Sequence, residues 1–322
     1  MGLIYSDIPE LEGSRTEIAL ANLLRLEGDV EAVVEKRIAH ICELSDAILR
    51  DGGDPDIIKS IFLSIRSDGN ADSGNVVDEN RALADAIFSE LSLVERLILF
   101  KETFGKLSGD KKEIFRQYWK EQEIDVPVEA SERIAYLKNS YNDAAYLQFS
   151  SLLSSPRAAY FGSITDVCES VYNGRCEYCI LPVETDTDGK LLSFFEIILK
   201  YGFKITAVYD LHSGNGYTRY ALLSRRFATQ VTGLRSKARN RYFEFIITDN
   251  DNVSLEELLT AARFCSLKLC RVDTLNFKSD RGGKGSHICP IFRCDGSDLQ
   301  TFLAFLAIDC PDFIPVGLYL QI

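Results

Sequence analysis

One pair of cysteines in the sequence, Cys176 and Cys179, has the spacing of half a zinc site. Two thiolates separated by two residues reach the same ion when they lie on a turn, and a second pair elsewhere then completes the site. The residues Cys176–Pro182 are instead typical of a β-strand, in which positions i and i+3 face opposite sides. No other two cysteines have this spacing. We therefore expect both cysteines to be buried as small hydrophobic side chains, and we expect no metal site.

A glycine-rich segment, Arg281-Gly282-Gly283-Lys284-Gly285, is similar in composition to a phosphate-binding loop. Loops of that kind carry a Gly-Lys-Ser/Thr sequence after a fixed spacing, and they open a helix. This segment has no such spacing, and the residues after it are typical of a strand. The sequence therefore predicts a hairpin loop at this position.

Basic residues are concentrated in one stretch, between Arg225 and Arg241. We interpret this stretch as a solvated linker between two domains. The alternative is a site that binds an anionic metabolite or an acidic partner. The basic residues are Arg225, Arg226, Arg235, Lys237, Arg239 and Arg241.

The composition of the 322-residue chain limits the classes of function. Hydrophobic residues make up 46% and charged residues 26%, which is typical of a globular domain protein. The formal net charge of −12 argues against nucleic-acid binding. No apolar run is long enough to span a membrane, and the start of the sequence does not have the pattern of a secretory signal. Nine cysteines without such a signal predict reduced thiols and a cytoplasmic protein, and three scattered histidines give no indication of a cofactor.

The residues from 1 to 128 have the pattern of a helical domain. Ser14-Arg15-Thr16-Glu17 has the form of a capping box and predicts a helix start. Apolar residues then recur with the period of one helix face, and Asp51-Gly52-Gly53 predicts the helix end. Further helices are predicted from Asp54-Pro55 to Ile65, from Asp78 to an end at Gly105 and Ser108-Gly109, and at Lys111–Gln122. The apolar face of the first helix contains Val30, Val34, Ile38, Ile41 and Ile48.

Strand and helix patterns alternate in the rest of the chain. Residues 129–230 alternate in a way that predicts one α/β lobe with a largely parallel sheet. Residues 231–322 have the order βαββαβ, which predicts a ferredoxin-like plait. The fold class expected is thus a multidomain combination of α/β and α+β parts. The strands expected in the lobe are Arg133–Leu137, Ala158–Phe161, Cys176–Pro182, Lys204–Tyr209 and Arg219–Leu223.

Several of these segments resemble the prephenate dehydratase family. Arg133–Leu137 with Ser140-Tyr141 is similar to its opening strand and helix, and Ile180-Leu181-Pro182-Val183-Glu184 is similar to its "LPIEN" strand end. Thr218-Arg219-Tyr220 resembles the Thr-Arg-Phe motif, and the plait, ending at Val316-Gly317-Leu318-Tyr319, resembles the ACT domain. In bifunctional members a helical chorismate mutase comes first. The resemblance thus implies a mutase-like, a dehydratase-like and an ACT-like domain in this order.

The resemblance implies roles for five residues. Thr218 would be the general acid that protonates the leaving hydroxyl, and Arg219 would bind a substrate carboxylate. The remaining three, Ser140, Glu184 and Thr185, would contact the substrate. The alternative is that all of them are ordinary residues of strands and strand-end turns.

The sequence also departs from the family pattern. The Gly-Pro-x-Gly turn after the first strand is missing, and Asp186 places a negative charge where a dicarboxylate should bind. The largest departure is a deletion, because Leu211 and Thr218 are only seven residues apart where the family has a whole second lobe. We expect a tight hairpin turn around Gly214-Asn215-Gly216 and a substrate site with one wall instead of two.

These observations lead to two hypotheses of function. The first is a catalytically impaired relative of chorismate mutase/prephenate dehydratase that senses a small carboxylate or amino acid, or serves as an interaction protein, in phenylalanine metabolism. The second is an active enzyme that converts prephenate to phenylpyruvate, water and carbon dioxide. Mutase activity of the helical domain is a further alternative, although the spacing of Arg25, Arg37, Arg50 and Arg81 does not fit the mutase pattern.

A homodimer is expected as well. Mutases of the helical type and ACT plaits usually self-associate, so the resemblance implies a dimer. A small plait also leaves a sheet face or an edge strand that needs cover, and symmetric pairing would supply it.

Overall fold

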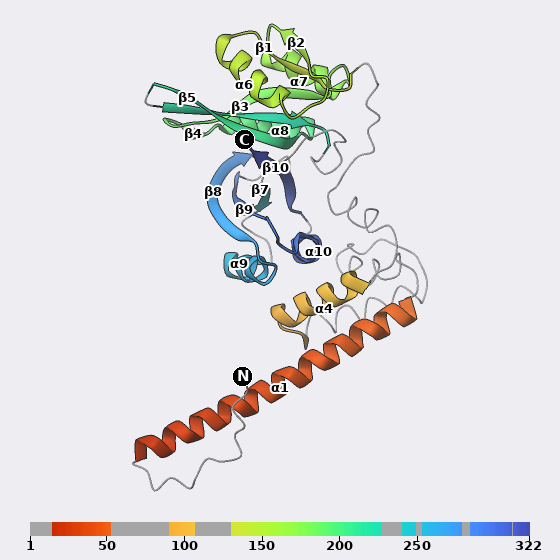
Figure 1. Ribbon diagram of the computed structural model, residues 1–322, viewed down its shortest axis with the longest axis vertical. Helices are drawn as coiled ribbons and strands as arrows, with labels where there is room; N and C mark the ends of the chain where they lie inside the picture. Colours follow the sequence, from red (N-terminus) through yellow and green to blue (C-terminus); the bar gives the residue numbers. More distant parts are fainter. Residues whose placement is uncertain are drawn as a thin grey trace.

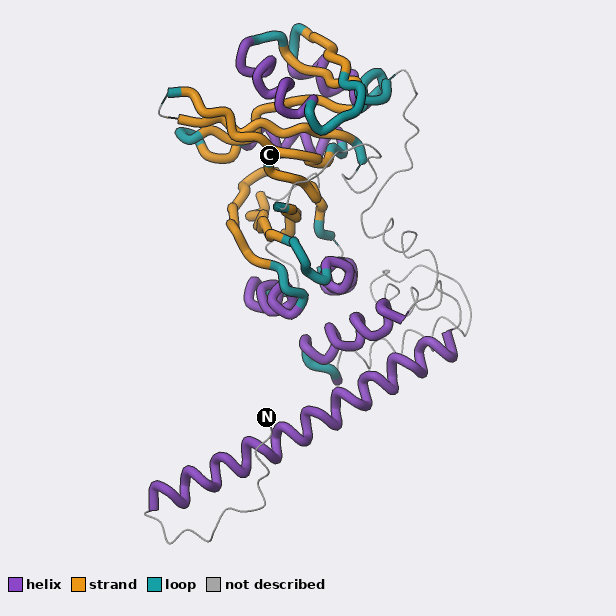
Figure 2. The backbone as a smooth tube through the Cα atoms, viewed as in Figure 1, coloured by secondary structure: helices purple, strands orange, loops and turns teal. Residues whose placement is uncertain are grey.

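The computed structural model describes residues 15–52, 90–106, 130–214, 216–226, 240–248, 253–278, 284–310 and 312–322. These residues form a mixed α/β protein, drawn in Figures 1 and 2. Its helices are α1 (Arg15–Gly52), α4 (Leu93–Lys106), α6 (Ser140–Ser150), α7 (Ile164–Tyr172), α8 (Leu192–Tyr201), α9 (Leu255–Phe264) and α10 (Leu299–Asp309). Its strands are β1 (Arg133–Leu137), β2 (Arg157–Phe161), β3 (Tyr178–Thr185), β4 (Gly189–Lys190), β5 (Lys204–Ser213), β6 (Gly216–Ser224), β7 (Arg241–Thr248), β8 (Lys268–Lys278), β9 (Lys284–Arg293) and β10 (Ile314–Gln321).

The α/β lobe contains β1 to β6, and its sheet is mixed. Strand β1 pairs in parallel with β2 and β3, but β6 lies antiparallel to both β3 and β5. The prediction of a largely parallel sheet is therefore wrong for the second half of the lobe. The cause is the short connection between β5 and β6, because strands joined by a tight turn pair in antiparallel fashion.

The short connection itself has the predicted form. Strands β5 and β6 pair from Lys204↔Ser224 to Ser213↔Gly216, which makes them a hairpin of one sheet. Gly214 has a φ of +61°, the left-handed conformation that glycine adopts without strain. The prediction of a hairpin in place of a second lobe is confirmed.

The plait has the predicted order of elements. Its strands lie in the order β10-β7-β9-β8, and all neighbours within it are antiparallel. Helices α9 and α10 cover one face of this sheet (Figure 1). Strands β8 and β9 form a hairpin from Lys268↔Arg293 to Lys278↔Lys284, so the glycine-rich segment connects two paired strands as predicted.

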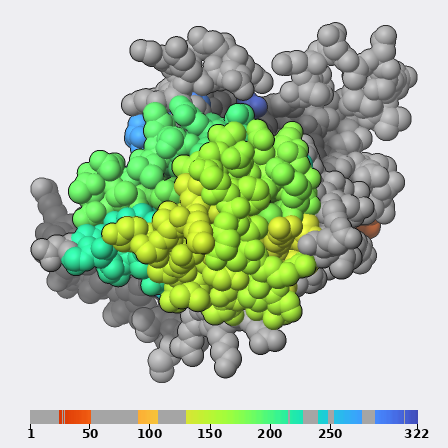
Figure 3. Space-filling model, turned by 90° about the horizontal axis from the view of Figure 1, so that it is seen from above, coloured from red at the N-terminus to blue at the C-terminus, as the bar shows by residue number. Residues whose placement is uncertain are grey.

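The lobe and the plait share one continuous sheet. Strand β10 pairs in parallel with β5, which gives the order β2-β1-β3-β6-β5-β10-β7-β9-β8, with β4 attached to β3. Gly317 lies at this junction opposite Ile205, where a Cβ atom would come within 2.7 Å of the Ile205 backbone oxygen. Figure 3 shows the lobe from above, where it lies over the plait. No sequence pattern indicated this joint sheet.

Elements of the same chain cover both faces of the plait. Its helices pack against α4 and against the C-terminal half of α1, in one core with Ile41, Ile48 and Phe100. Its other face shares a second core with Phe195 of α8 in the lobe. The plait therefore needs no second copy to cover its sheet faces, so the part of the physical reason for the predicted homodimer that concerns a sheet face is wrong, whereas β8 remains an edge strand.

Candidate functional site

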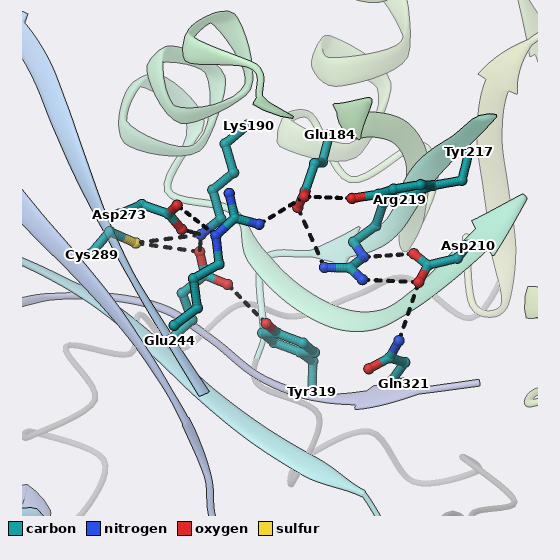
Figure 4. A network of polar contacts seen from close by, with 11 residues as sticks. Glu184, Lys190, Asp210, Tyr217, Arg219, Glu244, Asp273, Cys289, Tyr319 and Gln321 are labelled. Carbon is teal, nitrogen blue, oxygen red and sulfur yellow. Dashed lines mark hydrogen bonds and ion pairs between the residues drawn. The ribbon is translucent and has the colours of Figure 1, made fainter. Parts of the chain in front are cut away.

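Three charged side chains lie in a row across the middle of the lobe. Glu184 on β3 lies opposite Arg219 on the neighbouring strand β6, and Arg219 lies opposite Asp210 on β5. The guanidinium of Arg219 donates to both carboxylate oxygens of Asp210, at 2.6 and 2.9 Å, and to Oε2 of Glu184 at 3.4 Å. The Tyr217 hydroxyl donates to Oε1 of Glu184 at 2.8 Å (Figure 4). Arg219 is therefore bound by two carboxylates of its own chain.

The plait adds polar side chains to this row. Nη1 of Arg271 on β8 donates to Oε1 of Glu184 at 2.7 Å, and its Nε donates to Oδ1 of Asp273 at 2.6 Å. Gln321 on β10 donates to Oδ2 of Asp210 at 3.3 Å. The same carboxylates thus hold the lobe to the plait.

A second, more deeply buried group lies beside the row. Nζ of Lys190 on β4 is 2.6 Å from Oε1 of Glu244 on β7 and 2.9 Å from Oδ2 of Asp273. Glu244 also accepts hydrogen bonds from the Tyr319 hydroxyl at 2.9 Å and the Cys289 thiol at 3.3 Å (Figure 4). The ion pair between Lys190 and Glu244 joins the β3–β4 hairpin of the lobe to the centre of the plait sheet.

The charges of this polar network nearly cancel. The row and the buried group beside it form this network. Its cations are Lys190, Arg219 and Arg271, and each lies within ion-pair distance of at least one carboxylate. The four carboxylates are Glu184, Asp210, Glu244 and Asp273. Burial alone would lower the pKa of Lys190, but the negative charges of Glu244 and Asp273 outweigh it and raise that pKa. Hydrogen bonding to Asp210 likewise raises the pKa of Arg219. All three side chains thus stay cationic, and the protein's own carboxylates neutralise them.

The space between these side chains is small. A cavity of about 20 Å³ is lined by the polar network and by apolar residues of α8 and β5. This is room for about one water molecule. Pockets that bind metabolites commonly have volumes of roughly 300–1,000 Å³. The polar residues that line the cavity are Glu184, Lys190, Arg219, Glu244 and Tyr319.

Thr218 faces away from this network. It lies between Tyr217 and Arg219 on a regular stretch of β6, and successive side chains of a strand point to opposite faces. Its strand partners are Thr185 and Leu211, so it lies on the face of the sheet that α6 covers. The structure therefore brings Arg219 together with Glu184, and Thr218 together with Thr185, as two separate pairs.

The other two predicted contact residues have structural roles. The Thr185 hydroxyl donates to Oδ2 of Asp188 and accepts from the Asp188 backbone N–H, both at 3.0 Å, which holds the turn between β3 and β4. Ser140 is the exposed first residue of α6, after the N-cap Asn139. Asp186 lies against Gly216, where a Cβ atom would come within 2.9 Å of its carboxyl carbon.

Sequence analysis did not single out most residues of the network. These are Lys190, Asp210, Tyr217, Glu244, Arg271, Asp273, Tyr319 and Gln321. One signal was present in the sequence, because Glu244 is the only acidic residue in the apolar strand Arg241–Thr248. A single charge inside such a strand is rarely buried without a partner.

The cysteines are free and mostly buried, as predicted. Burial raises the pKa of Cys168 to about 11 and of Cys265 to about 12, and it raises the pKa of Cys179 and Cys289 well above the usual value. In the parts of the chain that the structure describes, no group of three or more metal-binding side chains is placed to hold an ion.

Cys270 on edge strand β8 is the exposed cysteine. We expect it to react first with an aromatic disulfide reagent at pH 8, because the thiols buried in the cores are both covered and protonated. About one thiol per chain should be modified in the fast phase, and Cys270→Ser should remove that phase. A fast phase that persists in the Cys270→Ser variant would show that another thiol, either the half-buried Cys42 or one in a core, is accessible.

The arginines considered for mutase activity do not converge. Arg25 and Arg50 are 25 residues apart on α1, which is about 38 Å at the rise of an α-helix. Arg37 is bound to Glu95 of α4, with Nε 2.5 Å from the carboxylate, and Arg50 donates to the backbone oxygen of Asp46. Arg81 lies outside the described residues, as do residues 227–239 of the basic stretch.

None of the helices in the described ranges combines the length and the apolar character needed to cross a bilayer.

Comparisons with known proteins give similarity of fold only. No protein-family model and no curated protein matches the chain. A prephenate dehydratase from Streptococcus mutans superposes with a TM-score of 0.47 at 19% identity, over 59% of this chain and 98% of the other. GqqA, described as a novel type of quorum quenching acylase, gives 0.45 at 15% identity, over 59% and 95%. The prephenate dehydratase from Arthrobacter aurescens in complex with L-Phe gives 0.43 at 11% identity, over 58% and 90%.

Proposed function

We propose that this chain is a catalytically impaired relative of the chorismate mutase/prephenate dehydratase family, and that it works as an interaction or ligand-sensing protein linked to phenylalanine metabolism. The observation that carries the proposal is that carboxylates of the same chain already bind the Arg219 side chain. This side chain is the predicted anion-binding residue, and Asp210 holds it with two hydrogen bonds while Glu184 adds a third. A substrate carboxylate would have to displace both.

The chemistry of dehydration supports the same proposal. Elimination of water with loss of carbon dioxide requires a proton donor beside the leaving hydroxyl and fixed carboxylates on the same substrate. Thr218 and Arg219 point to opposite faces of β6, so one substrate would meet both side chains only if this end of the strand rearranged. Loss of such positioning can raise the activation free energy of the reaction by roughly 7–11 kcal/mol.

A ligand would need another location. A more open hollow of about 300 Å³ lies between the end of α4 and the start of α10. Lys101 and Lys106 line it together with Glu102 and Asp298, so both signs of charge are present. An amino acid carries both signs as well, which makes this hollow the candidate place for the ligand-sensing role.

The alternative function is an active prephenate dehydratase. Thr218 and Thr185 are direct strand neighbours at the end of β3 where the predicted substrate contacts cluster, which favours this alternative. In that case Thr218 would be the general acid and Arg219 would bind a carboxylate after release from Asp210.

Turnover of prephenate distinguishes the two functions. We expect the purified protein to form phenylpyruvate at neutral pH no faster than buffer alone, and Thr218→Ala to behave in the same way. The buffer control is essential because prephenate decomposes in acid. Clear turnover by the wild type that Thr218→Ala abolishes would establish the enzyme and refute the proposal.

A further inference from the structure

The joint sheet ends at strand β2, at the outer end of the lobe (Figure 1). Among the described residues, no strand pairs with the outer side of β2. The Arg157 N–H donates to the carbonyl oxygen of Glu132, next to β1. The bonding direction alternates along a strand, so the backbone N–H and C=O groups of Ala158 and Tyr160 point away from β1. These four groups lie where a further strand could bond to them.

The residues of β2 suit pairing with a further strand. Ala158–Phe161 contains no charged residue and no proline, and the register with β1 is regular. The opposite edge strand of the sheet, β8, carries Lys268 and Arg271 and has a register shift after Leu269. Charges and bulges are the devices by which sheets usually prevent pairing with other chains. Strand β2 has neither device between its first residue and its end.

One face of β2 offers a place for an apolar side chain. Tyr160 is 52% exposed, and its ring packs against the edge of Tyr136 with the centroids 5.1 Å apart. Ala158 is exposed on the same face, two residues earlier. Because the alanine side chain is small, a side chain from a neighbouring strand can lie over it and contact the Tyr160 ring. Pairs of aromatic and β-branched residues across strands are favourable.

Cations lie at both ends of this edge. Nζ of Lys138 is 5.2 Å from the centroid of the Tyr160 ring, and Arg133 lies opposite Arg157 at the start of β2. Lys138 and Arg133 are exposed, and neither forms an ion pair with a described residue. If β2 paired with a second copy of itself, the Arg157 end would meet the Lys138 end and like charges would repel. An acidic strand is the complementary occupant.

We propose that the β2 edge binds an extended peptide segment of a partner protein, one with an apolar centre and acidic residues at its ends. The segment adds a strand to the joint sheet through the backbone of Ala158 and Tyr160, and an acidic side chain faces Lys138. The inference goes beyond the proposed function, because it uses no residue of the polar network or of the predicted substrate site.

Fluorescence anisotropy with a labelled peptide tests this edge. The probe has seven residues, with valine and threonine alternating between two terminal glutamates. We expect a dissociation constant of about 100 µM or lower, and weaker binding in 0.5 M salt. Ala158→Pro should weaken binding at least tenfold, because it removes an outward N–H and leaves the bonds to β1 in place.

Reversal of one charge tests the acidic preference. Lys138→Glu should weaken binding about tenfold, because it replaces attraction by repulsion. Lys200→Glu is the matched control and should leave binding unchanged, since Lys200 is also exposed and lies 4.9 Å from a tyrosine ring centroid, that of Tyr201. Equal affinities of the two variants would contradict the charge complementarity on which the choice of occupant depends.

Methylation of the peptide nitrogens tests strand addition itself. The N–H groups of every second peptide residue face the edge, so N-methylation of one alternate set should abolish binding and that of the other set should leave it within about twofold. This comparison changes no residue of the protein and holds even if Ala158→Pro does not fold. No binding at 1 mM probe, or equal binding of both methylated forms, would overturn the proposal. A wild-type dimer that Ala158→Pro dissociates would overturn it too, because a second copy would then occupy the edge.

Discussion

Replacing Lys190 by methionine is expected to lower the free energy of unfolding by about 3–5 kcal/mol. The Lys190 ammonium is nearly buried and lies 2.6 Å from Glu244, which is itself 3% exposed. The variant leaves the Glu244 carboxylate in the core with only the Tyr319 hydroxyl and the Cys289 thiol as donors. An ion that loses its partner in a low-dielectric environment is far more costly than the loss of a surface pair.

Urea unfolding of Lys190→Met against Lys200→Met measures this effect. Lys200 lies exposed on α8, ten residues along the chain, and its replacement should change stability by less than about 0.5 kcal/mol. Lys190→Arg keeps the charge and should recover part of the loss. Equal stabilities of the two methionine variants would mean that Lys190 does not neutralise Glu244.

Gly317→Ala is expected to cost about 1–3 kcal/mol by overpacking the junction between β10 and β5. A Cβ atom at this position would lie 2.7 Å from both Cβ and the backbone oxygen of Ile205. Because a strand backbone cannot move aside as a flexible side chain can, the two strands must separate. The variant should therefore loosen the joint between the lobe and the plait.

The control for this prediction is Gly105→Ala in α4, where a Cβ atom has open space. That variant should keep or gain stability, by up to about 1 kcal/mol, because alanine favours a helix. Hydrogen exchange of the β5 and β10 amides should accelerate in Gly317→Ala alone. Unchanged stability and exchange in that variant would contradict the close approach of the two strands.

Local patterns in the sequence predicted most of the individual elements. The capping box at Ser14 and the glycines after Asp51 predicted a helix that the structure places at Arg15–Gly52. The β5–β6 hairpin followed from a count of residues between two strands. Such features depend on neighbours a few residues apart, which a single sequence displays directly.

The joint sheet and the polar network could not be predicted in this way. Lys190 and Glu244 are 54 residues apart, and Arg271 is 87 residues from Glu184. Their meeting depends on the pairing of β5 with β10, which has no local signal because any strand edge offers the same backbone groups. Among the predicted site residues, Arg219 and Glu184 do lie together, but the carboxylate that neutralises Arg219 comes from Asp210, which sequence analysis left aside.

Binding of a dicarboxylate tests the central claim most directly, namely that the protein's own carboxylates occupy the cation of the predicted site. Calorimetric titration of the wild type with prephenate at neutral pH should show no binding up to about 1 mM, an affinity limit of roughly −4 kcal/mol. Arg219→Met should give the same flat titration. A micromolar dissociation constant for the wild type that Arg219→Met weakens tenfold or more would show that Arg219 is available to a ligand and would contradict the account.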